Sequence, residues 1–135
     1  MLKERVLAML VQEVPELKKI LDERLKDSIV LLDEDGIHVI WEMEIGPCIM
    51  ELLRQPEKNR TLLNQTFGLI EHLSEEQDED MTGFVILSVL LPMRNEKEIL
   101  PEAMRLMGDA TKKRWNEMQD YWRQFQLWML SQNQG

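Results

Sequence analysis

An apolar seam near the C-terminus constrains the fold of this chain more than any other sequence feature. Its large side chains follow one another at intervals of three, four, three and four residues, at Trp115, Met118, Trp122, Phe125 and Met129. This spacing places them along one face of an α-helix. The sequence therefore predicts a long final helix with one continuous apolar face.

The rest of the chain shows similar periodicity in shorter pieces that are separated by proline or glycine. The first piece carries apolar residues every fourth position, at Leu2, Val6, Leu10 and Val14. Pro15 then interrupts, and because proline is well tolerated at a first helical position, we expect a second helix to start there. From Gly46 onward the chain reads as helical, including a buried helix over residues 81–93 that Pro92 should end.

Residues 29–41 have a different pattern. Two apolar stretches rich in β-branched residues, 29–32 and 37–41, flank the sequence Asp33-Glu34-Asp35-Gly36. Asp-Gly between such stretches is a local signal for a β-hairpin, and a lone hairpin must lie against other elements to be stable. We therefore predict a mainly α protein, an antiparallel helix bundle or a HEAT-like array of helix pairs, with a small β-hairpin or extended excursion near residues 29–41.

Length and composition favour one intracellular domain. A chain of 135 residues is too short for two well-built cores, so we expect a single helical domain over residues 1–135, with residues 123–135 as a C-terminal extension of the last helix. The single cysteine, Cys48, cannot form an intrachain disulfide, and neither a secretory signal nor a membrane-spanning stretch is recognisable. The expected location is the cytoplasm, without membrane contact.

Negative charge is concentrated in the middle of the chain. The net charge is −9, and residues 31–80 carry thirteen acidic side chains against three basic ones. Nucleic acids and anionic membranes need local positive charge on the protein that binds them, so both are disfavoured as partners. A basic protein partner is favoured instead.

Three groups of short patterns follow one another along the chain. The first group consists of Val14-Pro15-Glu16-Leu17 followed by the apolar segment 37–41. The second group consists of residues 67–71, the acidic turn 74–80 and the apolar run 84–91. The third group consists of residues 103–108, 111–115 and 121–122. In this order, over roughly residues 10–122, they resemble a bacterial family of unknown function whose members are small proteins with a HEAT-like helical build.

The resemblance implies a role in neutralising toxins, because members of such families look like immunity proteins for bacterial toxins. This chain departs from the pattern by continuing past Trp122 with further large apolar residues. A basic toxin domain is the partner that the family resemblance and the acidic charge together suggest. Our leading hypothesis is an immunity protein that blocks a cognate toxin by covering its functional surface.

Two acidic segments, with one aromatic residue between them, form the candidate partner-binding surface. Carboxylates there would substitute for phosphates in a nuclease groove, and Trp41 would serve as the apolar anchor. The predicted contact residues are Asp33, Glu34, Asp35, Trp41, Glu42, Glu75, Glu76, Asp78, Glu79 and Asp80. The alternatives are a solvated turn that precedes a helix N-terminus for residues 75–80, and a buried position for Trp41.

The sequence predicts no catalytic centre, metal site or cofactor. His72 and Glu75 share a helix face, but the other residues that could complete a zinc site, His38 and Cys48, lie in separate segments. Calcium-loop spacing, a P-loop, a nucleophile elbow and a dinucleotide-type glycine run are absent from the sequence. A carboxylate-dependent hydrolase, which needs no local motif, stays as a third hypothesis.

The extension of the last helix suggests the alternative function. Phe125, Trp128 and Met129 could belong to the core or to an exposed patch that pairs two chains or holds a partner. The second hypothesis is therefore a structural or adaptor domain that forms a homodimer through this aromatic helix.

Overall fold

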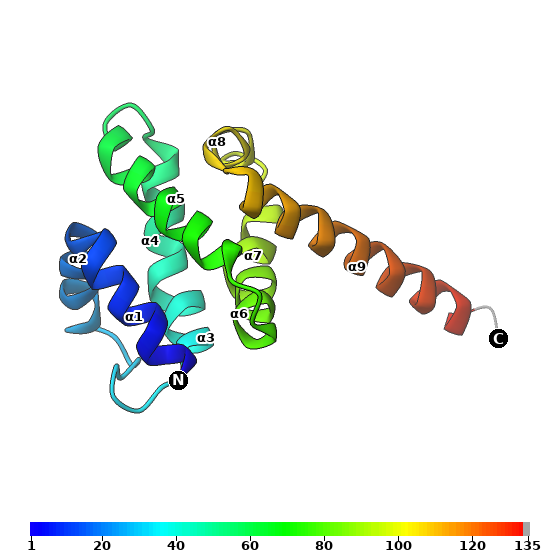
Figure 1. Ribbon diagram of the computed structural model, residues 1–135, viewed down its shortest axis with the longest axis horizontal. Helices are drawn as coiled ribbons and strands as arrows, with labels where there is room; N and C mark the ends of the chain where they lie inside the picture. The colour runs from blue at the N-terminus through cyan, green and yellow to red at the C-terminus, as the bar shows by residue number, and fades with distance from the viewer. Residues whose placement is uncertain (134–135) are drawn as a thin grey trace.

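The computed structural model describes residues 1–133, and the regular structure in this range is helical, without strands (Figure 1). The predicted mainly α class is confirmed. The elements in chain order are α1 (Leu2–Glu13), α2 (Pro15–Leu25), α3 (Ile37–Ile40), the π-helical η1 (Trp41–Ile45), α4 (Gly46–Arg54), α5 (Arg60–Glu75), α6 (Glu79–Phe84), the π-helical η2 (Val85–Leu90), α7 (Leu91–Arg94), α8 (Leu100–Leu106) and α9 (Asp109–Asn133).

The predicted corner at Pro15 is confirmed. Val14 leaves the helical conformation with φ −136° and ψ 64°, and its backbone N–H still bonds the Leu10 carbonyl. α2 then begins at Pro15, whose missing N–H costs nothing at a first helical position. Leu10, Val14 and Leu17 are buried at this corner, so both short helices contribute to the core.

The predicted β-hairpin near residues 29–41 is wrong, because residues 26–36 form turns and residues 37–54 form a helix. The backbone N–H of Leu31 donates to the Asp35 carboxylate at 2.7 Å, a side-chain bond typical of a turn. A strand with alternating burial would hide Val39 together with Ile37, yet Val39 is 40% exposed and Ile40 is buried. The helical spacing of the buried side chains outweighs the β propensity of the β-branched residues.

Two helices continue through a proline, which the sequence analysis did not anticipate. α3, η1 and α4 are contiguous, and so are α6, η2 and α7. In each, a π-helical stretch stops two residues before the proline, Pro47 or Pro92. A proline ring crowds the carbonyl four residues earlier, and the wider π turn relieves that crowding. The prediction of a helix over residues 81–93 is therefore confirmed, but the helix is buried on one face only, since Leu87 is 50% exposed, and it ends at Arg94 rather than at Pro92.

α5 occupies the centre of the molecule. It contacts α1, α2, α4, α6, α8 and α9, and its inner face is apolar, with Leu63, Phe67, Ile70 and Leu73 buried. Figure 1 shows α1 and α2 on one side of α5 and α6–α7 with α8 on the other. Most of the other helices thus pack directly on one central element.

α9 leaves the body of the molecule. Its first half packs on α5 and η2, and Trp115 and Met118 of the predicted seam lie in the core. Beyond Met118 no residue up to Asn133 is buried, and Figure 1 shows the helix extending away from the other elements. Of the predicted extension, residues 123–133 are helical, and residues 134–135 lie outside the described range.

Candidate protein-binding surface

A carboxylate at its N-terminus holds α9 against α5. Glu71 accepts hydrogen bonds from the backbone N–H groups of Ala110 and Thr111, both at 2.9 Å, and from the Thr111 hydroxyl at 2.8 Å. Burial favours a raised pKa for Glu71, but these three hydrogen bonds outweigh it and keep the pKa below its ordinary value. The carboxylate therefore stays negative where the helix dipole is positive.

Gly108 makes this approach possible. A Cβ at that position would lie 2.6 Å from the carboxyl carbon of Glu71, well inside van der Waals contact. The glycine just before α9 thus allows the helix start to come close to α5. Glu71 therefore serves the fold, by fixing the start of α9 against α5.

Arg114 makes a second connection between the two helices. It is a buried charged residue that donates from Nε to the Ser74 carbonyl and from Nη2 to the Glu76 carbonyl, both at 3.1 Å. These carbonyls lie at the end of α5, where helix carbonyls lack intrahelical donors. Its Nη1 atom pairs with Glu117 on α9 itself at 3.0 Å. Glu71 and Arg114 together set the direction in which α9 extends.

The outer part of α9 carries a dense group of exposed apolar side chains. They are between 41% and 64% exposed, and they are Tyr121, Phe125, Leu127, Trp128, Met129 and Leu130. Three aromatic rings lie in a row, with centroids 5.7 Å apart from Trp122 to Phe125 and 6.1 Å apart from Phe125 to Trp128. Tyr121, Phe125, Trp128 and Met129 lie on the same side of the helix as these rings, whereas Leu127 and Leu130 lie on the opposite side. Single exposed apolar residues are ordinary, but a contiguous group such as the four on the ring side is typical of an interaction surface.

A groove lies at the base of this exposed part, between α9 and the helix formed by α6, η2 and α7. One hollow of about 140 Å³ is lined by apolar side chains of both helices, and an adjoining hollow of about 500 Å³ is lined partly by polar ones. Both share Ile86, Leu87 and Tyr121. We call the smaller, apolar hollow the α9 groove. It is defined by the residues that line it, Ile86, Leu87, Leu91, Met118, Tyr121, Trp122 and Phe125.

The acidic run at residues 75–80 divides into two groups. Glu76 forms an ion pair with Arg5, and Asp78 caps α6 by accepting from the Met81 N–H at 3.0 Å, so both serve the fold. Glu75, Glu79 and Asp80 are exposed to solvent. Only part of the predicted acidic surface is therefore free for a partner.

The second acidic segment lies in the loop between α2 and α3. Asp33 and Glu34 are exposed, whereas Asp35 bonds the backbone of its own turn. In Figure 1 this loop and the start of α6 both lie at the lower end of the molecule, on either side of the N-terminus in that view. The two segments share one end of the molecule.

The predicted role of Trp41 as a surface anchor is wrong. Trp41 is 0% exposed and packs edge-on against Phe84 with ring centroids 5.4 Å apart. Its indole N–H has no hydrogen-bond partner among residues 1–133. The alternative prediction of a buried tryptophan is correct, although the residue lies in a π-helical turn and not in a strand.

Glu42, also a predicted contact, takes part in a polar cluster that sequence reasoning missed. The Ser88 hydroxyl donates to the Glu42 carboxylate at 2.8 Å, and the His38 Nδ1 atom lies 2.6 Å from the same hydroxyl. The three residues share their types with hydrolase triads, but here serine stands between histidine and glutamate and is only 1% exposed. The cluster therefore connects two helices. A lone serine in a buried apolar run was the available signal, because buried hydroxyls need partners.

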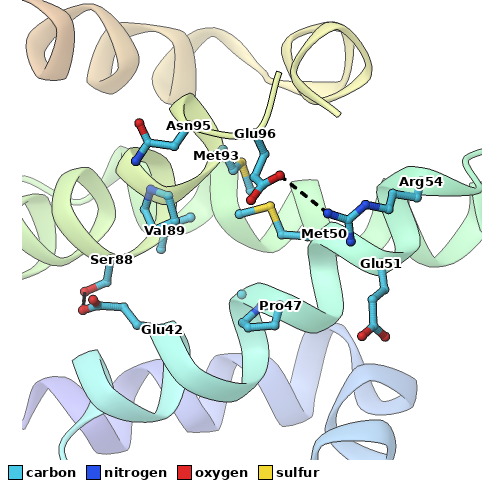
Figure 2. Close-up of a pocket in the computed structure, with 12 residues that line it drawn as sticks. Glu42, Pro47, Met50, Glu51, Arg54, Ser88, Val89, Met93, Asn95 and Glu96 are labelled. Carbon is cyan, nitrogen blue, oxygen red and sulfur yellow. Dashed lines mark hydrogen bonds and ion pairs between the residues drawn. The ribbon is translucent and has the colours of Figure 1, made fainter. Parts of the chain in front are cut away.

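A cleft of about 390 Å³ separates the same two helices, and Figure 2 shows its lining. Glu42, Glu51 and Glu96 contribute carboxylates to it. Each already has a partner within the protein, since Glu42 accepts from Ser88, Glu51 lies 3.5 Å from Arg24 and Glu96 lies 3.5 Å from Arg54. The three carboxylates of this cleft are thus paired within the protein.

No group of three or more His, Cys, Asp and Glu side chains within residues 1–133 has an arrangement that could hold a metal ion. No helix in the same range is both long enough and apolar enough to cross a membrane.

Comparison with known proteins places the chain in a family. A family model described as "Domain of unknown function (DUF7674)" matches residues 7–123, which is most of the chain. Neither curated proteins nor solved structures give a match. The match ends at Arg123, so Phe125, Trp128 and Met129 lie beyond it. The predicted resemblance to a family of unknown function is confirmed at this level, and the chain belongs to the DUF7674 family.

Proposed function

We propose that this protein works by binding another protein chain, and that the outer face of α9 with the α9 groove is its binding surface. The observation that carries the proposal is the uncovered aromatic row on a helix that projects from the body. Keeping such a surface in water is costly, at about 25 cal/mol per Å² of apolar area. Aromatic and methionine side chains are also the types that concentrate at the centres of protein interfaces.

The base of the helix supports the same proposal. Glu71 and Arg114 fix the direction of α9, and the rings of Trp122, Phe125 and Trp128 already lie in order. A surface that is ordered before binding loses less conformational entropy when it meets its partner. The helix therefore presents rigid apolar anchors to a partner.

Substitutions on two sides of α9 test this proposal. At 100° per residue, Phe125 and Met129 lie on the aromatic side, whereas Leu127 and Leu130 lie on the opposite side. We expect Phe125→Gln with Met129→Gln to abolish capture of the natural partner by the tagged full-length protein, while helix content measured by circular dichroism is unchanged. Leu127→Gln with Leu130→Gln is the matched control and should still capture it. Equal capture by both double variants would refute the α9 surface.

A second candidate function retains the immunity hypothesis, with a basic toxin as the partner at the acidic end of the molecule. The observations in its favour are the net charge of −9 and the exposed carboxylates of Asp33, Glu34, Glu75, Glu79 and Asp80. Such a surface would accelerate the approach of a basic protein and keep it in register. A cytoplasmic location and a HEAT-like arrangement of the helices belong to the same proposal.

Charge reversal tests this second function. Because Glu76 and Asp78 hold the fold, the variant should change only Glu75, Glu79 and Asp80 to lysine. We expect it to lose a basic partner that wild type retains at low salt and releases at high salt in a pull-down from the native cells. A control that reverses exposed acids elsewhere, Glu16→Lys with Glu98→Lys, should retain that partner. Retention of the same protein by the triple variant would rule out this acidic epitope.

A further inference from the structure

The two longest uncharged stretches of the chain meet at the α9 surface. Residues 81–93 and 124–135 contain no Asp, Glu, Lys or Arg. The first stretch supplies Ile86, Leu87 and Leu91 to the α9 groove, and residues 124–133 of the second form the projecting end of α9. Copies of a chain with net charge −9 repel one another. An uncharged apolar surface is the place where two such copies can meet without bringing like charges into direct contact.

The exposed apolar area reaches the lower limit for a specific dimer interface. The aromatic side of α9 presents Tyr121, Phe125, Trp128 and Met129, each between 41% and 64% exposed, and Leu87 adds to it from the groove. Large side chains of this kind bury about 150–250 Å² each, so half-exposed ones offer roughly 100 Å². Five of them give about 500 Å² per copy and about 1,000 Å² for a pair, which is the lower limit for a specific interface.

The geometry of α9 suits pairing with a second helix. Its seam continues at the same three-and-four spacing from the buried Trp115 and Met118 to the exposed Phe125 and Met129. This is the spacing at which two helices pack side by side at a shallow angle. The inner half of the seam is covered by the protein itself, and the outer half is exposed.

We propose that the partner on this surface is a second copy of the same chain. The proposal rests on the proposed function and names its occupant: the projecting end of α9 in each protomer lies in the α9 groove of the other. A two-fold pair brings the same patch of both copies together, so the patch must complement itself. A protruding uncharged helix beside a groove whose lining side chains are uncharged meets that requirement, although the Arg94 guanidinium lies over the Trp122 ring at 5.2 Å.

Sedimentation equilibrium of the full-length protein tests this proposal. We expect wild type to be a dimer at micromolar concentrations. Phe125→Gln with Met129→Gln should weaken dimerisation by at least about a hundredfold, because each substitution removes a central apolar contact. Leu87→Arg, which places a charge in the groove that receives the α9 helix of the other protomer, should have a similar effect. The control Leu127→Gln with Leu130→Gln should remain a dimer.

The possible outcomes separate this inference from the proposed function. If wild type is a monomer at the highest attainable concentration, self-association is overturned. The α9 surface would still be supported if wild type captured a different protein and the Phe125 and Met129 variant did not. A dimer that persists in the Phe125 and Met129 variant would place the contact between copies elsewhere and overturn the inference. Loss of the dimer in the Leu127 and Leu130 control would overturn it as well.

Discussion

Trp41→Ala is expected to lower the free energy of unfolding by about 4 kcal/mol, the usual cost of truncating a large buried aromatic residue. Trp41 is fully buried and packs against Phe84 at the contact between the two proline-containing helices. Its removal opens a cavity at that contact, and the surrounding helices can close it only in part. Urea unfolding followed by circular dichroism measures the loss.

Two further substitutions make the Trp41 experiment specific. Met43→Ala changes an exposed residue of the same π-helical turn and is expected to alter stability by less than about 0.5 kcal/mol. Trp41→Phe should cost less than alanine, since it refills most of the cavity and removes an indole N–H that has no partner within residues 1–133. A loss below about 1 kcal/mol for Trp41→Ala would contradict the buried position and return this residue to the list of surface anchors.

Glu71→Ala is expected to lower the free energy of unfolding by about 3 kcal/mol at pH 7, because it leaves the first N–H groups of α9 without a charged acceptor. Three hydrogen bonds from Ala110 and Thr111 end on this carboxylate. Gly108→Ala should act through the same contact, since the added Cβ would displace the carboxylate. The double variant should therefore lose less than the sum of the two single variants.

The effect of Glu71 depends on pH in a defined direction. Its pKa in the folded protein lies below the ordinary value of 4.5, so its contribution is complete above about pH 4.5 and is lost as the pH falls through the folded pKa. The stability difference between wild type and Glu71→Ala should consequently shrink in acid. Urea unfolding at pH 7 and pH 3 measures it, with Glu75→Ala, one turn later and exposed, as the control. A difference that stays constant, or that appears for Glu75→Ala as well, would contradict this assignment.

Several parts of the fold could be predicted from the sequence because they depend on local spacing. The corner at Pro15 follows from the fixed φ of proline and its missing N–H. The buried helix over residues 81–93 and the seam of α9 follow from apolar side chains at helical intervals. The candidate α9 surface was likewise visible in Phe125, Trp128 and Met129, since these residues are too apolar to be left in water without a reason.

The wrong predictions concern features of the fold that depend on contacts between residues far apart in the sequence. Residues 37–41 look like a strand by composition, but their helix is set by what Ile40 and Trp41 pack against, including Phe84. Pro92 looks like a helix end, but a π turn lets the chain continue, and no local rule specifies where such a turn will form. The acidic run looks uniform, yet Arg5 and the start of α6 use two of its carboxylates and leave the others exposed.

The sequence by itself determined a helical chain with a negative middle segment, an uncharged apolar end and membership of a family of unknown function, since each of these depends on residue type and spacing alone. Only the tertiary structure decided which of those residues are free to bind. It placed Trp41 in the core, used Glu71, Glu76 and Asp78 to hold helices, and left the outer face of α9 uncovered. The physical reason is that burial and ion pairing depend on contacts between residues far apart in the chain, whereas helix periodicity depends on the spacing of neighbouring residues.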